Sequence, residues 1–362
     1  MINETLVRTS LFDNHVELGA KMVTYSGFEM PVSYEGLKVE HAAVREKVGM
    51  FDVSHMGEFT VKGNDATAFL QSITTNDVSK LTVGKIQYSC IPNGKGGIVD
   101  DLLIYKEGED EYLLVVNAGN IAKDWEFVSK KAESFDVKLE DTSETWSLIA
   151  LQGPDATEAL TPLMDSSPGE LKYYTFMRAE VLGVECIVSA TGYTGSGGYE
   201  IYIPNHHAPR VWTELLNKGV TPCGLGARDT LRMEMGFCLY GNDIDETTNP
   251  IEAGLGWITK FTKDFTDKAL LEKIKLDGPK RKLKGLKMLG RGIPRQGYEV
   301  VTRSGDIVGV ITSGTMSPSM GFGIGMAYLE SDYSKKGTEL AVRIRNKDID
   351  AEVVLFPFLK KD

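Results

Sequence analysis

The chain has 362 residues and a formal net charge of −11 at pH 7, with 42% hydrophobic and 25% charged residues. This length predicts about two to three domains, and this composition excludes a disordered or fibrous protein. An acidic chain binds phosphate backbones poorly, so we expect no nucleic-acid partner. Glycine is in excess, at 38 residues against a usual share of about 7%.

Targeting and metal-binding signals are absent from the sequence. Residues 1–9 carry acids and bases and no apolar stretch, unlike a secretory signal or a transit peptide. No apolar run approaches the ~18 residues that a membrane span needs. The four cysteines are far apart, and no histidine stands at zinc spacing from them. We therefore expect reduced thiols, no metal site, no membrane partner and a cytoplasmic protein.

The first 260 residues mix helical and strand patterns. Apolar spacing predicts helices over 37–50 with a stop near Gly49, after the caps at 64–65 and at Asn120, after Pro154, and over 205–218. Short apolar runs rich in β-branched and aromatic residues predict strands at 58–62, 101–106, 112–117, 146–151, 185–190 and 199–203. The pattern indicates an α+β or α/β body and leaves strand direction open.

The texture changes after about residue 260. Residues 260–295 hold twelve Lys or Arg against four Asp or Glu, so the rest of the chain is more acidic than its total. A solvated linker is the simpler interpretation, and a docking surface for an acidic partner or ligand tail is the alternative. From residue 282 onward successive strands with turn signals, including a hairpin over 298–312, predict a small antiparallel barrel.

Two adjacent carboxylates follow a glycine-rich turn at 94–97. Because neighbours in a strand point to opposite faces, only one of Asp100 and Asp101 can face a given site. The other caps the turn or meets solvent, and a plain polar hairpin end is equally compatible with the pattern. Tyr88, on the preceding segment, lies beside the inward carboxylate if the two strands pair.

The densest glycine cluster lies at 191–200 and is followed by a strand. Since it has neither a Lys-Ser/Thr ending nor a following helix, it is a poor phosphate loop. Glycine backbone permits close approach to a flat ligand, against which Tyr193 and Tyr199 can pack. Glu200 can then accept paired N–H bonds from a heterocycle. A flexible loop is the alternative, but it explains only the glycines.

Two further segments carry near-miss motifs. Residues 224–229 resemble half of a dinucleotide fingerprint, but no strand precedes them, so we expect no nucleotide cofactor. Instead Arg228, in the first turn of a helix, is suited to anchor a carboxylate or carbonyl, or to pair with an acid such as Glu200. The Ser-His pair at 54–55 lacks a nucleophile elbow, so we interpret 51–57 as a structural turn from which Met56 reaches a pocket.

Taken in order, eleven short segments resemble the aminomethyltransferase family of the glycine cleavage system, the T-proteins. They are Arg-Thr-Ser-Leu-Phe at 8–12, Gly-Phe-Glu-Met-Pro at 27–31, Phe-Asp-Val-Ser-His-Met-Gly-Glu at 51–58, Thr-Asn-Asp at 75–77, Gly-Ile-Val-Asp-Asp-Leu at 97–102, Leu-Gln-Gly-Pro at 151–154, Thr-Gly-Tyr-Thr-Gly at 191–195, Gly-Ala-Arg-Asp at 226–229, Asn-Pro-Ile-Glu at 249–252, Thr-Ser-Gly-Thr at 312–315 and Pro-Phe at 357–358. Their order and number make the resemblance specific.

The resemblance implies an α+β, three-domain cloverleaf around a central folate cavity, with a C-terminal antiparallel β-barrel. We expect residues 1–55 and 140–260 to form domain 1, 56–139 domain 2, 261–281 a linker and 282–362 the barrel. The implied reaction of glycine catabolism moves the methylene carbon of an aminomethyl group from the lipoyl arm of H-protein to tetrahydrofolate. Ammonia and 5,10-methylenetetrahydrofolate result, with tetrahydrofolate as co-substrate and lipoylated H-protein as partner.

The resemblance also assigns the site residues. It makes Asp101 the catalytic carboxylate, which positions the folate and stabilises developing positive charge as ammonia leaves. Folate contacts fall on Tyr88, Tyr193, Glu200 and Arg228, and further cavity positions on Met56, Tyr105, Asn117, Tyr173, Trp257 and Arg295. Ala190 and residues 196–198 depart from the usual pattern, which affects the loop geometry and not the reaction.

Two other protein classes share this kind of fold. The folate domain of sarcosine or dimethylglycine oxidases accompanies a large flavin domain, for which this chain has no room. A non-enzymatic folate-binding protein of the iron–sulfur maintenance type carries Lys-Gly-Cys-Tyr-x-Gly-Gln. The corresponding stretch here, 237–242, lacks the Lys and the Gln, so we expect Cys238 to be a core thiol.

Overall fold

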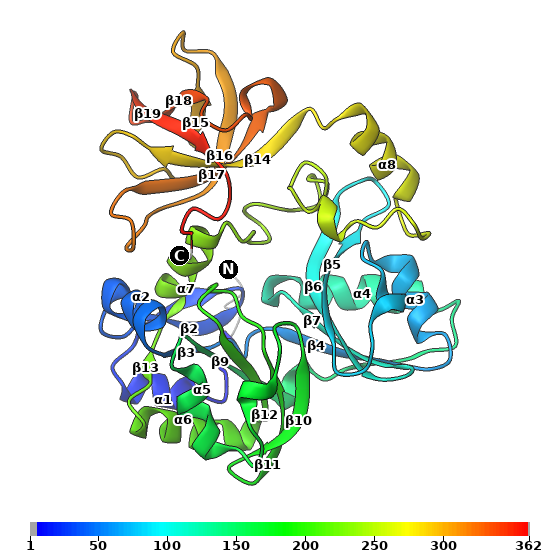
Figure 1. Cartoon of the computed structure of the whole chain (residues 1–362). Coiled ribbons are helices and arrows are strands. Elements are labelled where there is room, and N and C mark those ends of the chain that lie inside the picture. Colours follow the sequence, from blue (N-terminus) through cyan, green and yellow to red (C-terminus); the bar gives the residue numbers. More distant parts are fainter. Residues whose placement is uncertain (1–5, 361–362) are drawn as a thin grey trace. The chain divides into compact units, whose positions relative to one another are not determined.

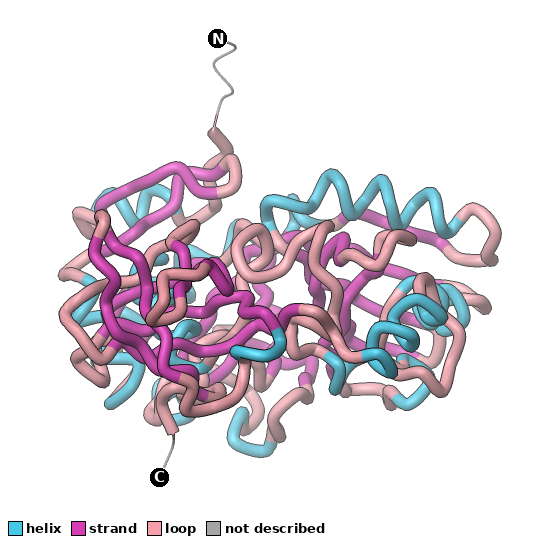
Figure 2. Tube along the Cα trace, turned by 90° about the horizontal axis from the view of Figure 1, so that it is seen from above, coloured by secondary structure: helices cyan, strands magenta, loops and turns pink. Residues whose placement is uncertain are grey.

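The protein is described by a computed structural model, which covers residues 6–360 (Figure 1). The chain divides into two compact units, each described here by itself. Unit 1 comprises the residues up to Phe69, Val78–Tyr88 and Leu102–Asp229; unit 2 comprises Leu70–Asp77, Ser89–Asp101 and the residues from Thr230 onward. Both units contain helices and strands. Figure 2 shows the two kinds of element along the trace, which confirms the predicted α+β class.

Unit 1 is built around a six-stranded sheet in the order β10-β11-β12-β9-β3-β13. Its strands are β10 (Phe176–Val181), β11 (Val184–Ser189), β12 (Gly198–Pro204), β9 (Trp146–Gln152), β3 (Gly49–Asp52) and β13 (Thr221–Pro222). All neighbours are antiparallel except β13 and β3. The sequence left the strand direction open, and the sheet is mixed.

The side chains of strand β12 alternate between the apolar core and the opposite face of the sheet. Tyr199, Ile201 and Ile203 belong to a buried apolar cluster that also includes Trp212 of helix α6 (Ala208–Asn217). The residues between them therefore face the other side of the sheet, and Glu200 is among them. Tyr199 is thus a core residue, which differs from the expectation that it packs on a ligand.

Residues 12–235 also contain a hairpin, a five-stranded sheet and short helices. The hairpin is β1 (Lys21–Tyr25) and β2 (Phe28–Ser33), and the sheet has the order β5-β6-β7-β4-β8. Its strands are β5 (Ile86–Pro92), β6 (Ile98–Gly108), β7 (Glu111–Val116), β4 (Gly57–Lys62) and β8 (Lys138–Asp141). The helices are α1 (Phe12–Glu17), α2 (Leu37–Glu46), α3 (Ala66–Ile73), α4 (Ile121–Ala132), α5 (Ala156–Leu160) and α7 (Leu225–Met235).

The predicted helix over 37–50 is too long. Helix α2 ends at Glu46, and Gly49 and Met50 instead begin strand β3, where they pair with Gln152 and Leu151. A Cβ on Gly49 would lie 2.6 Å from Val44 and 2.7 Å from the Cys223 sulfur. This glycine therefore serves close packing rather than helix termination.

Unit 2 contains a closed antiparallel barrel with the strand order β14-β17-β16-β15-β18-β19. Its strands are β14 (Arg281–Met288), β17 (Gly323–Glu330), β16 (Ile307–Met316), β15 (Glu299–Val301), β18 (Glu339–Ile344) and β19 (Lys347–Val354). Pairing of β19 with β14 closes it, and alternate residues of each strand fill the interior. The predicted C-terminal barrel is confirmed.

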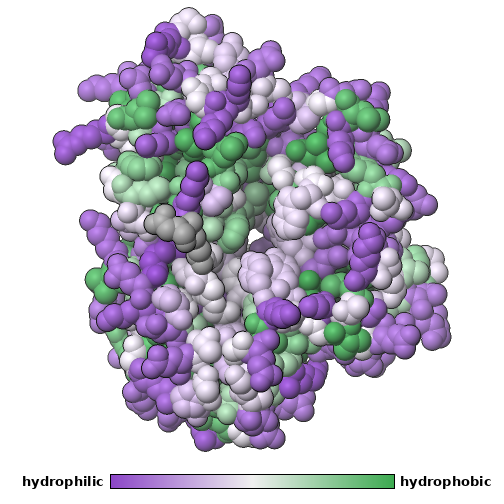
Figure 3. Space-filling view, in the orientation of Figure 1, coloured by the Kyte–Doolittle hydropathy of each residue, from purple (hydrophilic) through white to green (hydrophobic). Residues whose placement is uncertain are grey.

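The segment before the barrel is not wholly irregular. It contains helix α8 (Lys268–Asp277) inside the expected linker 261–281. The boundaries of the three expected domains stay a prediction. In the face that Figure 3 shows, hydrophilic side chains dominate the outline of the molecule, and hydrophobic residues occupy smaller areas. The four cysteines are free thiols, as predicted, and Cys238 packs against a buried cluster around Met233.

Candidate active site

The glycine-rich loop between β11 and β12 is held firmly, which argues against a flexible loop. Thr194 Oγ1 donates to Gln152 Oε1 at 2.8 Å, and Arg45 Nη1 donates to the Thr194 carbonyl at 2.5 Å and to Ser196 Oγ at 2.8 Å. A Cβ on Gly192 would lie 2.0 Å from Gln152 Oε1. Ser196, one of the departures from the family pattern, thus takes part in fixing the loop.

Tyr193 and Arg228 form one part of the candidate site in unit 1. The guanidinium carbon of Arg228 lies 4.7 Å from the centroid of the Tyr193 ring. Both residues are half-buried. Within residues 6–360, Arg228 Nη1 is buried and has no hydrogen-bond partner. A buried cationic donor without a partner is suited to an acceptor group of a ligand.

Helix α7, which carries Arg228 in its first turn, has a fixed start. The Arg228 N–H donates to the Gly224 carbonyl, and the Gly224 N–H donates to Glu40 Oε2 at 2.9 Å. Glu40 is completely buried and also accepts the Tyr34 and Gly36 N–H groups. An acidic group at a helix N-terminus stabilises the helix. These contacts fix the backbone position from which the Arg228 side chain extends.

Glu200 lies on β12 and is 7% exposed. Its Oε2 accepts the Thr191 hydroxyl at 2.5 Å. Burial raises the pKa of Glu200, and the Thr191 hydrogen bond and the Arg228 charge oppose that rise. Arg228 and Glu200 form no ion pair among the described residues, so the sequence alternative of a simple internal pair is not what the geometry shows.

The sequence gives His55 no functional role, because no nucleophile elbow surrounds the Ser-His pair at 54–55. Its ring is 3% exposed, packs edge-on against Tyr25 and Phe28, and leaves Nδ1 without a partner in the described part of the chain. Burial, followed by the charge of Arg228, lowers the pKa of His55 to about 4. The ring is therefore neutral near pH 7. Met56, the next residue, is half-buried.

The other expected folate positions of unit 1 differ in exposure. Tyr88 on β5 and Asn117 after β7 are half-buried, whereas Tyr173 is 67% exposed and contacts Tyr174. Tyr105 is completely buried, and its hydroxyl bonds with Ser189 and Tyr202. A direct folate contact at these positions stays a prediction.

Asp100 and Asp101 lie near the start of strand β6, in the part of that strand that belongs to unit 2, and they have different environments. Asp100 is completely buried and Asp101 is half-buried, as the alternation of a strand requires. Burial raises the pKa of the Cys90 thiol, and the charge of Asp101 raises it further. Burial also raises the pKa of the Cys238 thiol, with further contributions from the charges of Asp243 and Asp101. Asp101 therefore lies near two uncharged thiols.

Hydrogen bonds hold both backbone groups of Ile98, the first residue of β6. The Ile98 N–H donates to the Asp245 carbonyl at 3.1 Å, and the Tyr240 hydroxyl donates to the Ile98 carbonyl at 3.0 Å. A Cβ on Gly97 would lie 1.8 Å from the Glu246 carbonyl oxygen. The glycine turn before the two carboxylates thus depends on this close approach. The sequence gives no signal for Tyr240, because its segment, 237–242, matters there only as the place where the motif of the iron–sulfur maintenance type is lacking.

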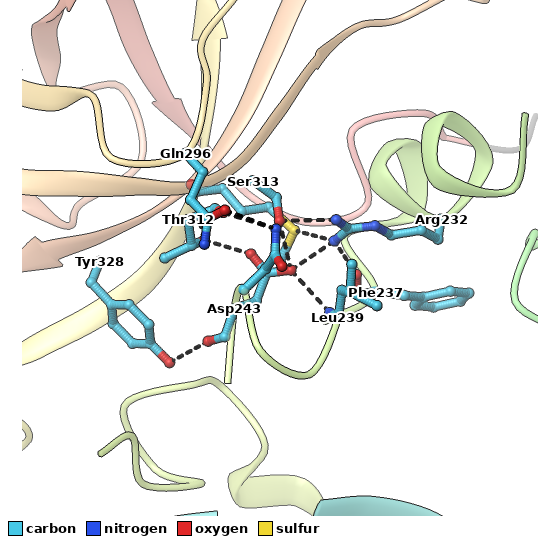
Figure 4. A network of polar contacts seen from close by, with 10 residues as sticks. Arg232, Phe237, Leu239, Asp243, Gln296, Thr312, Ser313 and Tyr328 are labelled. Carbon is cyan, nitrogen blue, oxygen red and sulfur yellow. Dashed lines mark hydrogen bonds and ion pairs between the residues drawn. The ribbon is translucent and has the colours of Figure 1, made fainter. Parts of the chain in front are cut away.

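An ion pair in unit 2 fastens the segment after α7 to the barrel (Figure 4). Arg232 Nη1 lies 2.7 Å from Asp243 Oδ2, and both side chains are buried. Ser313 Oγ accepts from Arg232 Nη2 at 2.9 Å and donates to Asp243 Oδ2 at 3.0 Å. Thr312 Oγ1 donates to Asp243 Oδ1 at 2.5 Å, and the Tyr328 hydroxyl donates to the Asp243 carbonyl at 2.8 Å. Every oxygen of this carboxylate is therefore bonded.

The last two expected positions, Trp257 and Arg295, are exposed in unit 2. Trp257 is 62% exposed, and Arg295 Nη1 donates to the Gly314 carbonyl at 3.3 Å. Over residues 6–360 no group of three or more His, Cys, Asp or Glu side chains is arranged to hold a metal ion. In the same range no helix combines the length and apolar character of a membrane span.

Comparisons with known proteins agree with the fold. The model of the GCVT N-terminal domain matches residues 11–263, and that of the glycine cleavage T-protein C-terminal barrel domain matches residues 281–360. Curated relatives named aminomethyltransferase include one from Flavobacterium psychrophilum, 52% identical over 98% of this chain and 99% of its own, and one from Chloroherpeton thalassium, 49% identical over 98% and 99%.

A solved structure gives the same result. The glycine cleavage system aminomethyltransferase T of Bartonella henselae matches with a TM-score of 0.93 and 33% identity, over 98% of both chains. The fold is therefore that of the T-protein class. The chain belongs to the aminomethyltransferase family of the glycine cleavage system and is an enzyme of that kind, rather than a non-enzymatic folate-binding protein.

Proposed function

We propose that this enzyme transfers the methylene carbon of an aminomethyl group, carried on the lipoyl arm of H-protein, to tetrahydrofolate. The carbon–sulfur and carbon–nitrogen bonds of the aminomethyl group break, and two bonds to folate nitrogens form. The products are 5,10-methylenetetrahydrofolate, ammonia and dihydrolipoyl H-protein. The proposal places the reaction in the cytoplasm, where four free thiols stay reduced.

One observation carries the folate assignment: Nη1 of Arg228, beside the Tyr193 ring, has no hydrogen-bond partner among the residues that the structure describes. A pterin offers carbonyl acceptors, an adjacent pair of N–H donors and a flat face. Arg228 can donate to an acceptor, Glu200 can accept the paired N–H groups, and Tyr193 can pack on the ring. The fixed loop and helix start let these side chains keep their positions before the ligand binds.

Asp101 takes the catalytic role in this proposal. Its carboxylate is proposed to hydrogen-bond N10 of the folate and to stabilise positive charge that develops as ammonia leaves. Support comes from its partial burial near two uncharged thiols, where a dielectric lower than that of water strengthens the attraction between the carboxylate and a positive charge. The anchored start of β6 gives this carboxylate a defined place.

The direct test is ammonia release. The purified chain is mixed with aminomethylated H-protein, and tetrahydrofolate is then added. We expect ammonia and methylenetetrahydrofolate to form in equal amounts and only when both substrates are present. Ammonia release that is independent of tetrahydrofolate, or none at all with both substrates, would contradict the proposed reaction.

Replacing Arg228 by alanine is expected to weaken tetrahydrofolate binding by about 10- to 100-fold, the scale of one hydrogen bond to a charged group. Isothermal titration calorimetry under anaerobic conditions measures the dissociation constant. Arg210→Ala is the matched control, because Arg210 is exposed and its hydrogen bond to the Leu182 carbonyl is long, at 3.4 Å. Equal dissociation constants for Arg228→Ala and the control would remove Arg228 from the folate site.

The basic stretch 260–295 is proposed to attract an acidic partner surface or a folate polyglutamate tail. Arg281 is unsuited to a test, because it bonds Glu252 at 3.0 Å. Lys273 and Lys280 are exposed. We expect Lys273→Glu/Lys280→Glu to raise the KM for H-protein, or for polyglutamylated folate, several-fold at low salt and less at high salt.

The control for this charge reversal is Lys335→Glu/Lys336→Glu, which changes two exposed lysines outside the stretch. It carries the same change in net charge. If both double variants raise the two KM values equally, the effect belongs to net charge and not to the stretch.

A further inference from the structure

A chain of buried hydroxyl groups leads to Glu200 in unit 1. Thr191 Oγ1 lies 2.7 Å from Ser189 Oγ, Ser189 Oγ lies 3.2 Å from the Tyr105 hydroxyl, and that hydroxyl lies 2.8 Å from the Tyr202 hydroxyl. Each of these residues is at most 3% exposed. The chain joins β6 to β11 and β12, and none of its members except Tyr105 was expected to matter from the sequence.

Sheet register places these groups together. Ser189 of β11 is paired with Glu200 of β12, so their side chains stand on the same face. Tyr202 is two residues further along β12 and shares that face. The opposite face of β12 carries the apolar cluster around Trp212. The polar side of this strand is therefore a continuous line of hydroxyls ending in a carboxylate.

The carboxylate fixes the direction of the chain. An ionised carboxylate only accepts, so Thr191 donates its single hydroxyl hydrogen to Glu200. Ser189 must then donate to Thr191, Tyr105 to Ser189, and Tyr202 to Tyr105. A longer contact of 3.3 Å from Ser189 Oγ to the Glu200 carbonyl competes with one of these bonds. Successive donors polarise one another, and this strengthens the last bond to the carboxylate.

We propose that Tyr105, through Ser189 and Thr191, is a positioning residue that holds the Glu200 carboxylate ionised and aimed for ligand binding. This rests on the proposed function, in which Glu200 binds the pterin. Tyr105 then acts on the ligand without touching it. The ligand chemistry that such a carboxylate recognises is an adjacent pair of N–H donors on a heterocycle.

Several titratable groups act on Glu200 or respond to it. Burial raises its pKa, while Thr191 and Arg228 lower it. Burial, followed by the charge of Glu200, raises the pKa of Tyr105 and of Tyr173. Burial also raises the pKa of Tyr202. The charges of Tyr105, Glu200 and Glu58 raise it further. Loss of the hydroxyl chain would add to the effect of burial and raise the Glu200 pKa further.

The experiment measures tetrahydrofolate binding to the full chain by calorimetry, anaerobically and as a function of pH, for Tyr105→Phe. We expect the dissociation constant to rise about three- to tenfold, the scale of one net hydrogen bond. We also expect the pH below which affinity falls to move upward, because protonated Glu200 cannot accept both N–H groups. The same substitution in a Glu200→Gln background should have no further effect.

Tyr112→Phe is the matched control. Tyr112 is also completely buried, and its hydroxyl bonds Thr67 Oγ1 at 2.6 Å, away from the chain to Glu200. We expect it to lower thermal stability to a similar extent and to leave both the dissociation constant and its pH dependence unchanged. This separates positioning of Glu200 from general loss of packing.

Three results would overturn the inference, and they are distinguishable. Tyr105→Phe with unchanged affinity shows that the chain does not act on Glu200. An equal loss of affinity in the Glu200→Gln background shows that Tyr105 contacts the ligand itself. Glu200→Gln with unchanged affinity removes Glu200 from the folate site, and with it this part of the proposed function.

Discussion

Asp101→Asn is expected to lower turnover by about 100-fold or more, the scale of losing a positioned catalytic group. Asparagine keeps the shape of the side chain and one acceptor oxygen, replaces the other oxygen by an NH2 donor, and removes the negative charge. In the proposed reaction that charge stabilises the centre from which ammonia departs. The KM for tetrahydrofolate should change little, because the proposed pterin contacts are Glu200, Arg228 and Tyr193. The measurement is the steady-state rate of methylenetetrahydrofolate formation with aminomethylated H-protein.

The neighbouring carboxylate provides the control. Asp100 is completely buried and points to the opposite face of β6. We expect Asp100→Asn to lower thermal stability and to leave the turnover of the folded enzyme within a few-fold of its original value. If Asp100→Asn abolished turnover and Asp101→Asn did not, the catalytic role would pass to the other member of the pair.

The second large effect concerns stability. Asp243→Asn is expected to reduce the free energy of unfolding of unit 2 by about 3–5 kcal/mol, because it removes the negative charge that lies 2.7 Å from the buried Arg232 guanidinium. Arg232 is 2% exposed, so solvent compensates little for the loss of the anion. Urea denaturation followed by circular dichroism measures the change.

A surface ion pair in the same unit serves as the comparison. Arg343 Nε lies 2.9 Å from Asp348 Oδ1, and both side chains are partly exposed. Asp348→Asn is expected to cost at most about 1 kcal/mol, since solvent screens an exposed pair. If Asp243→Asn and Asp348→Asn reduced the free energy of unfolding by similar amounts, the buried Arg232–Asp243 pair would not stabilise unit 2 more than an exposed ion pair does.

Much of the fold is predictable from local pattern. The strands of β4, β9 and β12, the helix α6 and the β15–β16 hairpin follow from apolar spacing and turn residues, because these signals lie within a few residues of one another. The alternation of Asp100 and Asp101 is also local, so the sequence established that their environments differ. The end of α2 was not predictable, since pairing of Gly49 with Gln152 overrides the helical pattern.

For the candidate site, too, some features follow from the sequence and others only from the tertiary structure. The sequence by itself determined the family and the glycine turns, because ordered motifs need no three-dimensional information, and it predicted the folate-contacting residues, which stay a prediction. Only the tertiary structure showed that Tyr105 bonds Ser189, which is 84 residues away, and that Arg281 is paired with Glu252. It also showed that Nη1 of Arg228 has no hydrogen-bond partner within the part of the chain that the structure describes. Periodicity tells which face a side chain takes. It does not tell which distant group meets that face, because this depends on sheet order and on the packing of whole elements.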